Sequence, residues 1–123
     1  MTASKTDRLD TALSALRRAM PDVRGALVAT SDGLPIAKSF SDNTDASRVA
    51  AMAATANGLG KRISDTLGTG TLSEMSVAGH SGQVFFYTAG ARAVLAVVTP
   101  PDANLGLLHM EARETAQAVA AIL

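Results

Sequence analysis

Residues 71–99 read TLSEMSVAGHSGQVFFYTAGARAVLAVVT and carry the strongest fold signal in the chain. Three strand-like runs, Thr71–Ala78, Gln83–Thr88 and Ala93–Thr99, are separated by two short breaks. The breaks, Gly79-His80-Ser81-Gly82 and Ala89-Gly90-Ala91-Arg92, have the length and glycine content of hairpin turns. Because strands joined by such turns pair antiparallel, the segment predicts three neighbouring strands of one antiparallel sheet.

A further hairpin is predicted upstream of this segment. The run Gly25–Thr30 and the run Leu34–Ser39 flank Ser31-Asp32-Gly33, whose glycine can adopt a positive φ in a turn. Pro35, near the start of the second run, has no N–H to donate to a strand ladder. The proline therefore predicts that this strand lies at an edge of the sheet or begins there.

Three helices are predicted around the strands, because apolar residues recur at steps of three and four. The first covers about Thr6 to Met20, and the second about Asp45 to Leu67. The third runs from a cap at Asp102 or Asn104 to Leu123. Its predicted buried stripe comprises Leu105, Leu108, Ala112, Thr115, Val119 and Ile122.

The resulting order is αββαβββα, and 123 residues suit a single domain covering residues 1–123. The predicted class is α/β in the broad sense, more narrowly α+β. Helices pack on one five-stranded antiparallel sheet.

Composition and charge exclude several functional classes. The chain has 11 Lys and Arg against 11 Asp and Glu, so no net field attracts nucleic acid. It has no cysteine, which removes thiolate nucleophiles and cysteine metal sites. No apolar run reaches the roughly 18 residues of a membrane span, so we expect no direct membrane insertion. The polar start Met1–Asp7 lacks the apolar core of a signal peptide, which predicts a cytoplasmic protein.

No residue set indicates catalysis, a cofactor or a metal. His80 and His109 have no metal-binding motif around them, and we interpret them as a solvated turn residue and a helix-surface residue. Gly58-Leu59-Gly60-Lys61 lacks the spacing of a phosphate loop and lies inside a helical pattern. Asp42 and Asp45 are explained by capping of the second helix. We therefore predict a protein that is not an enzyme.

The second predicted helix points to self-association. It has a heptad-like apolar stripe and also a broad side of alanine and glycine, and a helix that is apolar or small on two sides usually buries both. The strand that follows has no proline or lysine to protect its edge. We predict a homodimer across a two-fold axis. The predicted interface residues are Val49, Met52, Ala53, Ala56, Leu59, Ile63, Leu72, Met75 and Val77.

Four basic residues are predicted contacts for another partner. Arg48, Lys61 and Arg62 lie on the second helix, where they fit the rim of an interface or simply a solvated face. Arg92 lies at a strand turn, where it fits either a contact to a partner's phosphate or a solubilising role at the hairpin end.

Several stretches together resemble the Roadblock/LC7 family, the longin-like dynein light-chain class. Pro21-Asp22-Val23-Arg24-Gly25-Ala26 resembles the family's passage from its first helix into its first strand, and Ser31–Ala37 resembles its characteristic hairpin. Ala93–Val98 resembles its last strand, and Asn104–Arg113 the opening of its final helix. The stretches come in the family's order over nearly the whole chain, and the family's αββαβββα fold agrees with the one predicted above.

This resemblance implies a dimer in which the middle strands join into one continuous sheet and the second helices pack together. Prokaryotic members commonly partner Ras-like small GTPases, and gliding-motility regulators of this type act as GTPase-activating proteins. The resemblance therefore implies a non-catalytic, homodimeric regulatory or scaffold protein that binds a Ras-like small GTPase, and it leaves open whether the protein stimulates hydrolysis or only scaffolds. The alternative is a small-molecule sensor or a general interaction module without a GTPase, because fold alone does not set function.

Overall fold

A computed structural model describes residues 3–123, so Met1 and Thr2 of the polar N-terminal segment lie outside the described residues. Its helices are α1 (Lys5–Ala19), α2 (Ala46–Leu67) and α3 (Leu105–Ile122). Its strands are β1 (Gly25–Thr30), β2 (Pro35–Phe40), β3 (Glu74–Gly79), β4 (Gly82–Ala89) and β5 (Ala93–Thr99). The predicted order αββαβββα is confirmed within these residues.

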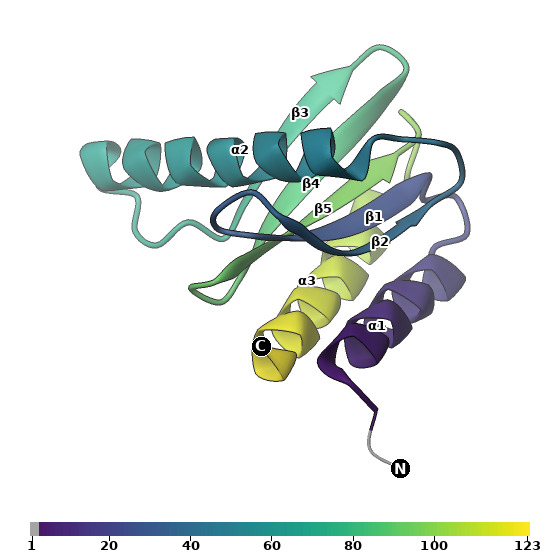
Figure 1. Cartoon of the computed structure of the whole chain (residues 1–123). Coiled ribbons are helices and arrows are strands. Elements are labelled where there is room, and N and C mark those ends of the chain that lie inside the picture. Colours follow the sequence, from purple (N-terminus) through teal and green to yellow (C-terminus); the bar gives the residue numbers. More distant parts are fainter. Residues whose placement is uncertain (1–2) are drawn as a thin grey trace.

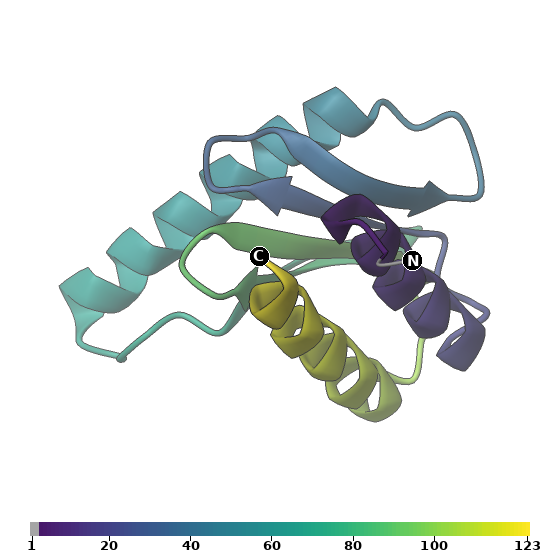
Figure 2. The same cartoon turned by 60° about the horizontal axis from the view of Figure 1, so that its bottom comes forward.

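The five strands form one antiparallel sheet in the order β2-β1-β5-β4-β3. Helix α2 covers one face of the sheet, and α1 and α3 lie together on the other (Figure 1). Figure 2 shows the same three layers from below, with α1 and α3 side by side. The long-range pairing of β1 with β5 joins the β1–β2 hairpin to the three consecutive strands β3, β4 and β5.

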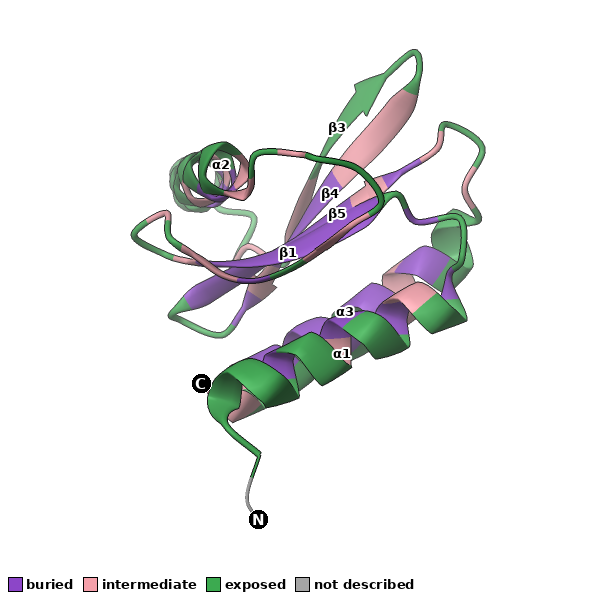
Figure 3. Ribbon diagram, turned by 45° about the vertical axis from the view of Figure 1, so that its right-hand side comes forward, coloured by how far each residue is buried: buried purple, intermediate pink, exposed green. Residues whose placement is uncertain are grey.

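The two faces of the sheet hold two separate cores. Val28, Tyr87 and Leu95 point toward α1 and α3, whereas Leu27 and Val94 point toward α2. Successive residues of a strand point to opposite faces, so a strand covered on both faces must be apolar throughout. This explains the unbroken run in β5, which Figure 3 shows buried between the helical layers.

The helices begin where side chains cap them. Asp45 accepts a hydrogen bond from the Arg48 N–H at the start of α2, and Asn104 accepts one from Leu107 at the start of α3. The capping interpretation of Asp45 is therefore confirmed, and Asn104 is the cap of the last helix. Asp42 instead accepts hydrogen bonds from the Thr44 hydroxyl and N–H, which lower the pKa of its carboxyl group.

Two further local predictions are wrong. The strand predicted from Thr71 begins at Glu74, because Gly68 and Gly70 take positive φ and the pairing with β4 starts at Glu74 and Tyr87. Leu105 was expected in the buried stripe of α3 but is 42% exposed, because the packed face of that helix begins at Leu108.

Candidate protein-interaction surface

Helix α2 packs on the sheet with its small residues. Ala50, Ala53, Asn57 and Gly60 are buried, and they form the face that rests on the strands. A Cβ on Gly60 would lie 2.3 Å from the Met75 sulfur, so the glycine permits the close approach of helix and strand. Small side chains on the packed face leave the larger apolar residues for the sides of the helix.

The larger residues of α2 form an exposed apolar flank. Met52, Leu59, Ile63 and Leu67 are between 46% and 70% exposed, although each is apolar. Val49 and Ala56 are half-buried and continue the same side of the helix toward the sheet. We call the six residues Val49, Met52, Ala56, Leu59, Ile63 and Leu67 the apolar flank. Contiguous exposed apolar area of this kind marks an interaction surface.

The apolar flank lies on the side of α2 that faces β3. Met75 of β3 packs against the same core as Val49 and Ala56, and Gly60 approaches both Met75 and Leu72. The opposite side of the helix contacts the β1–β2 turn, where Gly33 meets Ala51 and Ala54. Val77 extends the apolar surface along β3 and is 57% exposed.

Strand β3 is an edge strand whose outer backbone groups face no other described strand. Between Glu74 and Gly79 it has no lysine, no proline and no register shift. These are the usual devices that stop an edge from pairing with another chain. The apolar flank and the open edge of β3 therefore form one continuous surface.

Most of the predicted interface residues lie on this surface. Val49, Met52, Ala56, Leu59 and Ile63 belong to the apolar flank, and Leu72, Met75 and Val77 lie on or just before β3. Ala53 does not lie on this surface, because it is fully buried against the chain's own sheet. The expectation that both glycines of α2 mark close packing holds for Gly60 only, since nothing lies within 4 Å of a Cβ on Gly58.

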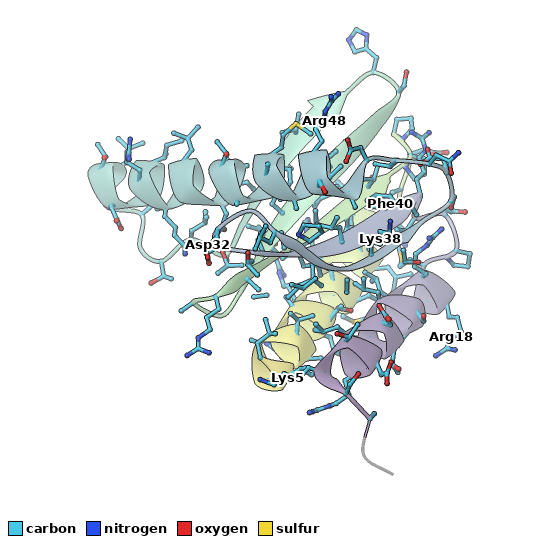
Figure 4. All side chains as sticks on the ribbon, in the orientation of Figure 1. Lys5, Arg18, Asp32, Lys38, Phe40 and Arg48 are labelled. Atoms are coloured by element: carbon cyan, nitrogen blue, oxygen red, sulfur yellow. The ribbon has the colours of Figure 1, made fainter. Side chains whose placement is uncertain are left out.

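The four predicted basic contacts are exposed, but the structure does not bring them together. Arg48 precedes Met52 by one helical turn and Arg62 follows Leu59 by three residues, so both border the apolar flank. Lys61 lies about 200° around the helix from Leu59, on the other side. Figure 4 shows Arg48 near the start of α2, on the side of the helix away from α1 and α3.

Arg92 lies elsewhere, in the turn between β4 and β5. The Ser31 N–H donates to the Arg92 carbonyl, and the Ser31 hydroxyl donates to the Ala91 carbonyl. This places Arg92 beside the β1–β2 turn rather than beside β3.

A polar cluster that sequence reasoning missed fixes β3 to α3. Glu74 accepts two hydrogen bonds from Arg113, at 2.6 and 3.3 Å, and lies 3.5 Å from His109 Nδ1. The Tyr87 hydroxyl lies 2.8 Å from the same His109 nitrogen. Burial and the Glu74 carboxylate raise the pKa of Tyr87, although Arg113 opposes this. His109 is therefore half-buried among these groups and is not the surface residue expected.

Two features are absent from residues 3–123. No three side chains of His, Cys, Asp or Glu gather there in a metal-binding arrangement. No helix in that range has the combination of length and hydropathy needed to cross a membrane.

Comparison with known proteins identifies a family. The model of the Roadblock/LC7 domain matches residues 9–99. An uncharacterised protein of Methanocaldococcus jannaschii is 33% identical over 100 residues, which cover 81% of this chain and 87% of that protein. A Roadblock/LC7 domain from Streptomyces avermitilis is 26% identical, with a TM-score of 0.84, covering 91% of this chain and 94% of that one.

Structures of MglB share the same fold. The gliding protein MglB from Thermus thermophilus superposes with a TM-score of 0.87 at 20% identity, covering 99% of this chain and 93% of that one. A second MglB structure, with a tetrameric arrangement, gives 0.89 at 21% identity, covering 99% and 92%. Together with the family match, these likenesses confirm the predicted roadblock architecture.

Proposed function

The chain belongs to the Roadblock/LC7 family, and from this premise we propose that it is a homodimeric scaffold for a Ras-like small GTPase. The partner class rests on what the family resemblance implies for prokaryotic members. The assembly rests on the surface formed by the apolar flank and β3. In this proposal the protein acts by binding its partners.

The observation that carries the proposal is the position of the exposed apolar residues. Met52, Leu59, Ile63 and Val77 are all about half exposed and lie along one side of α2 and the adjoining edge strand. A second copy related by a two-fold axis would cover the flank with its own flank and pair its β3 with this β3. Such pairing buries apolar area and also satisfies the free backbone groups of both edges.

The same arrangement leaves a face for the GTPase. Arg48 and Arg62 border the flank and point to its outer side, about 21 Å apart along the helix axis. Across a two-fold axis, four arginines would rim the paired helices. Charged rims of this kind mainly steer encounter and fix orientation, while the apolar centre supplies affinity.

Stimulation of hydrolysis, where it occurs, would act through the switch loops of the GTPase. Arg92 is the exception that merits a test, because it is exposed in the β4–β5 turn and lies beside the β1–β2 turn. If Arg92→Ala leaves stimulated hydrolysis intact, a direct catalytic role of this side chain is excluded.

The test is capture of partners by the tagged protein from its native lysate, with GDP and with a non-hydrolysable GTP analogue. We expect a Ras-like GTPase that is retained mainly in the GTP state. The double variant Arg48→Glu and Arg62→Glu should lose this partner. Lys5→Glu, which reverses an exposed charge on α1, is the matched control and should retain it.

Each other outcome has a definite meaning. Equal retention with both nucleotides would support a scaffold that does not read the switch, because equal affinity shifts no equilibrium. Absence of any GTPase with either nucleotide would contradict the proposal and favour the small-molecule sensor.

A further inference from the structure

Ion pairing within residues 3–123 converges on a single acidic side chain, Glu74, the first residue of β3. An Arg113 nitrogen lies 2.6 Å from one carboxylate oxygen, and His109 Nδ1 lies 3.5 Å from the other. The chain has 11 basic and 11 acidic residues, yet its close acid–base contacts in this range gather at one end of the open edge strand.

The start of β3 is held by few other contacts. It follows a connection in which Gly68 and Gly70 take positive φ, and a Cβ on either glycine would meet nothing within 4 Å. Within β3, Glu74 and Met75 are half-buried, whereas residues 76–79 are exposed. These two side chains therefore anchor the strand in addition to its backbone pairing with β4.

The two anchors act on opposite faces of the sheet. Met75 packs against the core beneath α2 and lies close to Gly60. Glu74, the preceding residue, points to the other face, where it accepts two hydrogen bonds from Arg113 of α3. Figure 1 shows α2 and α3 on these two faces. Together the anchors fix the start of β3 relative to the apolar flank.

This relative position matters for self-association. In the proposed dimer, one second copy covers the apolar flank and pairs with the edge of β3 at the same time. A surface that already has the required shape loses less conformational freedom on binding than one that must be ordered. If the start of β3 moved against α2, the second copy could not meet both parts of the surface without ordering them first.

We propose that Arg113 is a positioning residue for self-association, acting through Glu74 on the edge of β3. The inference rests on the proposed homodimer. Arg113 lies on α3, on the face of the sheet opposite the apolar flank, so it acts without belonging to the surface itself. Its planar guanidinium group donates two hydrogen bonds to one carboxylate, which fixes the orientation of the Glu74 side chain as well as its distance.

The opposite edge of the sheet supplies a matched control. Arg17 of α1 donates hydrogen bonds to the carbonyl and hydroxyl groups of Ser39 in β2 and to the Ser41 hydroxyl. Both edge strands are thus tied by an arginine to the layer of α1 and α3. Only β3 adjoins the apolar flank, so a positioning role in association belongs to Arg113 and not to Arg17.

The first test measures the dimer dissociation constant by sedimentation velocity over a dilution series. Arg113→Met should raise it at least tenfold, and Arg17→Met should change it less than twofold. Glu74→Gln should match Arg113→Met, and the double variant of Glu74 and Arg113 should add little, because the two side chains act as one unit. Equal effects of Arg113→Met and Arg17→Met, or fully additive effects in the double variant, would overturn the proposal.

The second test separates positioning from general stabilisation of the fold. Leu59→Lys, which places a charge on the apolar flank, supplies a single-chain background, and NMR follows its amide hydrogen exchange. Adding Arg113→Met should speed exchange at least tenfold for the β3 amides that bond to β4 and leave β1 and β5 unchanged. Equal acceleration throughout the sheet would assign Arg113 a merely structural role and overturn the proposal.

The two levels of the account fail differently. A wild type with the mass of one chain at micromolar concentration would overturn the proposed homodimer and this inference with it. A dimeric wild type whose dissociation constant is unchanged by Arg113→Met would overturn this inference alone.

Discussion

The two edges of the sheet differ in how they meet solvent. Strand β2 begins with Pro35, carries the exposed Lys38 and has a register shift against β1 at Val28 and Ala29. Figure 4 shows Lys38 on this strand. Strand β3, at the other edge, has none of these features and adjoins the apolar flank. Strand β2 is therefore protected against pairing with another strand, and β3 is not.

This difference indicates the direction in which two copies of the chain would associate. Proline, lysine and a bulge each discourage strand pairing, and their absence on one edge alone leaves a single direction in which the sheet can grow. Growth through one edge across a two-fold axis closes after two copies, whereas two open edges would permit fibres. The contrast between β2 and β3 therefore predicts a dimer and not a polymer.

Protecting the open edge should have the largest effect. Val77→Lys places a charge on β3 where two copies would pair, and we expect the dimer dissociation constant to rise at least 100-fold, or about 2.7 kcal/mol. Leu34→Lys, beside β2, is the matched control. Sedimentation velocity over a dilution series measures both variants, and equal dimer affinities would contradict the contrast between the two edges.

Removing the protection of β2 should have the next largest effect. The double variant Pro35→Val and Lys38→Val gives the sheet a second open edge, so we expect association beyond the dimer that increases with concentration. Lys61→Val removes the same charge from the side of α2 away from β3 and should remain dimeric. Light scattering measures the masses of the double variant and of Lys61→Val. Identical masses would show that Pro35 and Lys38 are not what prevents β2 from pairing with another chain.

Two glycines of α2 test the close contact with β3 on a scale of about 1 kcal/mol. Gly58→Ala should raise the free energy of unfolding by about 1 kcal/mol, because alanine favours the helix and nothing lies near the new methyl group. Gly60→Ala gains the same propensity but displaces Met75 and Leu72. In urea denaturation, Gly60→Ala should have a lower free energy of unfolding than Gly58→Ala. Equal free energies would mean that Met75 and Leu72 move away from the new methyl group at no cost.

The smallest effect at neutral pH concerns the attachment of β3 to α3. The pKa of Tyr87 is raised in the folded chain above its ordinary value near 10, so folding favours the protonated phenol. This contribution is complete below pH 10 and is lost as pH rises through the folded pKa. The stability of the wild type should fall above pH 10 more steeply than that of Tyr87→Phe.

The measurement is direct, because Tyr87 is the only tyrosine in the chain. Its ionisation can be followed by absorbance at alkaline pH, in the folded protein and in urea. Glu74→Gln should lower the folded value, since the carboxylate is one cause of the shift. A folded midpoint equal to that in urea would contradict the burial of the phenol.

The fold could be predicted because its signals are local. Each hairpin places its turn residues between its own strands, and each helix repeats its apolar positions over several turns. Pro35 correctly predicted an edge strand. The start of β3 could not be predicted, because Thr71-Leu72-Ser73 has strand-like residues and only the positive φ of Gly68 and Gly70 shows that the chain is still returning from α2.

Which apolar residues are exposed on α2 and β3 could be predicted in part. The repeat of α2 identified two faces suited to burial, but sequence alone does not say which of them rests on the sheet. Ala53 was therefore assigned to the wrong face, whereas Leu59 and Ile63 lie on the exposed one. The cluster of Glu74, His109 and Arg113 gave no signal, because its members are far apart in the sequence and meet only when α3 packs on β4, the strand next to β3.

The mass of the wild-type protein in solution tests the central claim most directly. If the apolar flank and the open edge of β3 form a self-association surface, light scattering at micromolar concentration will give twice the mass of one chain. Leu59→Lys, which places a charge at the centre of the flank, will then give the mass of a single chain. A wild type with the mass of one chain would contradict the account.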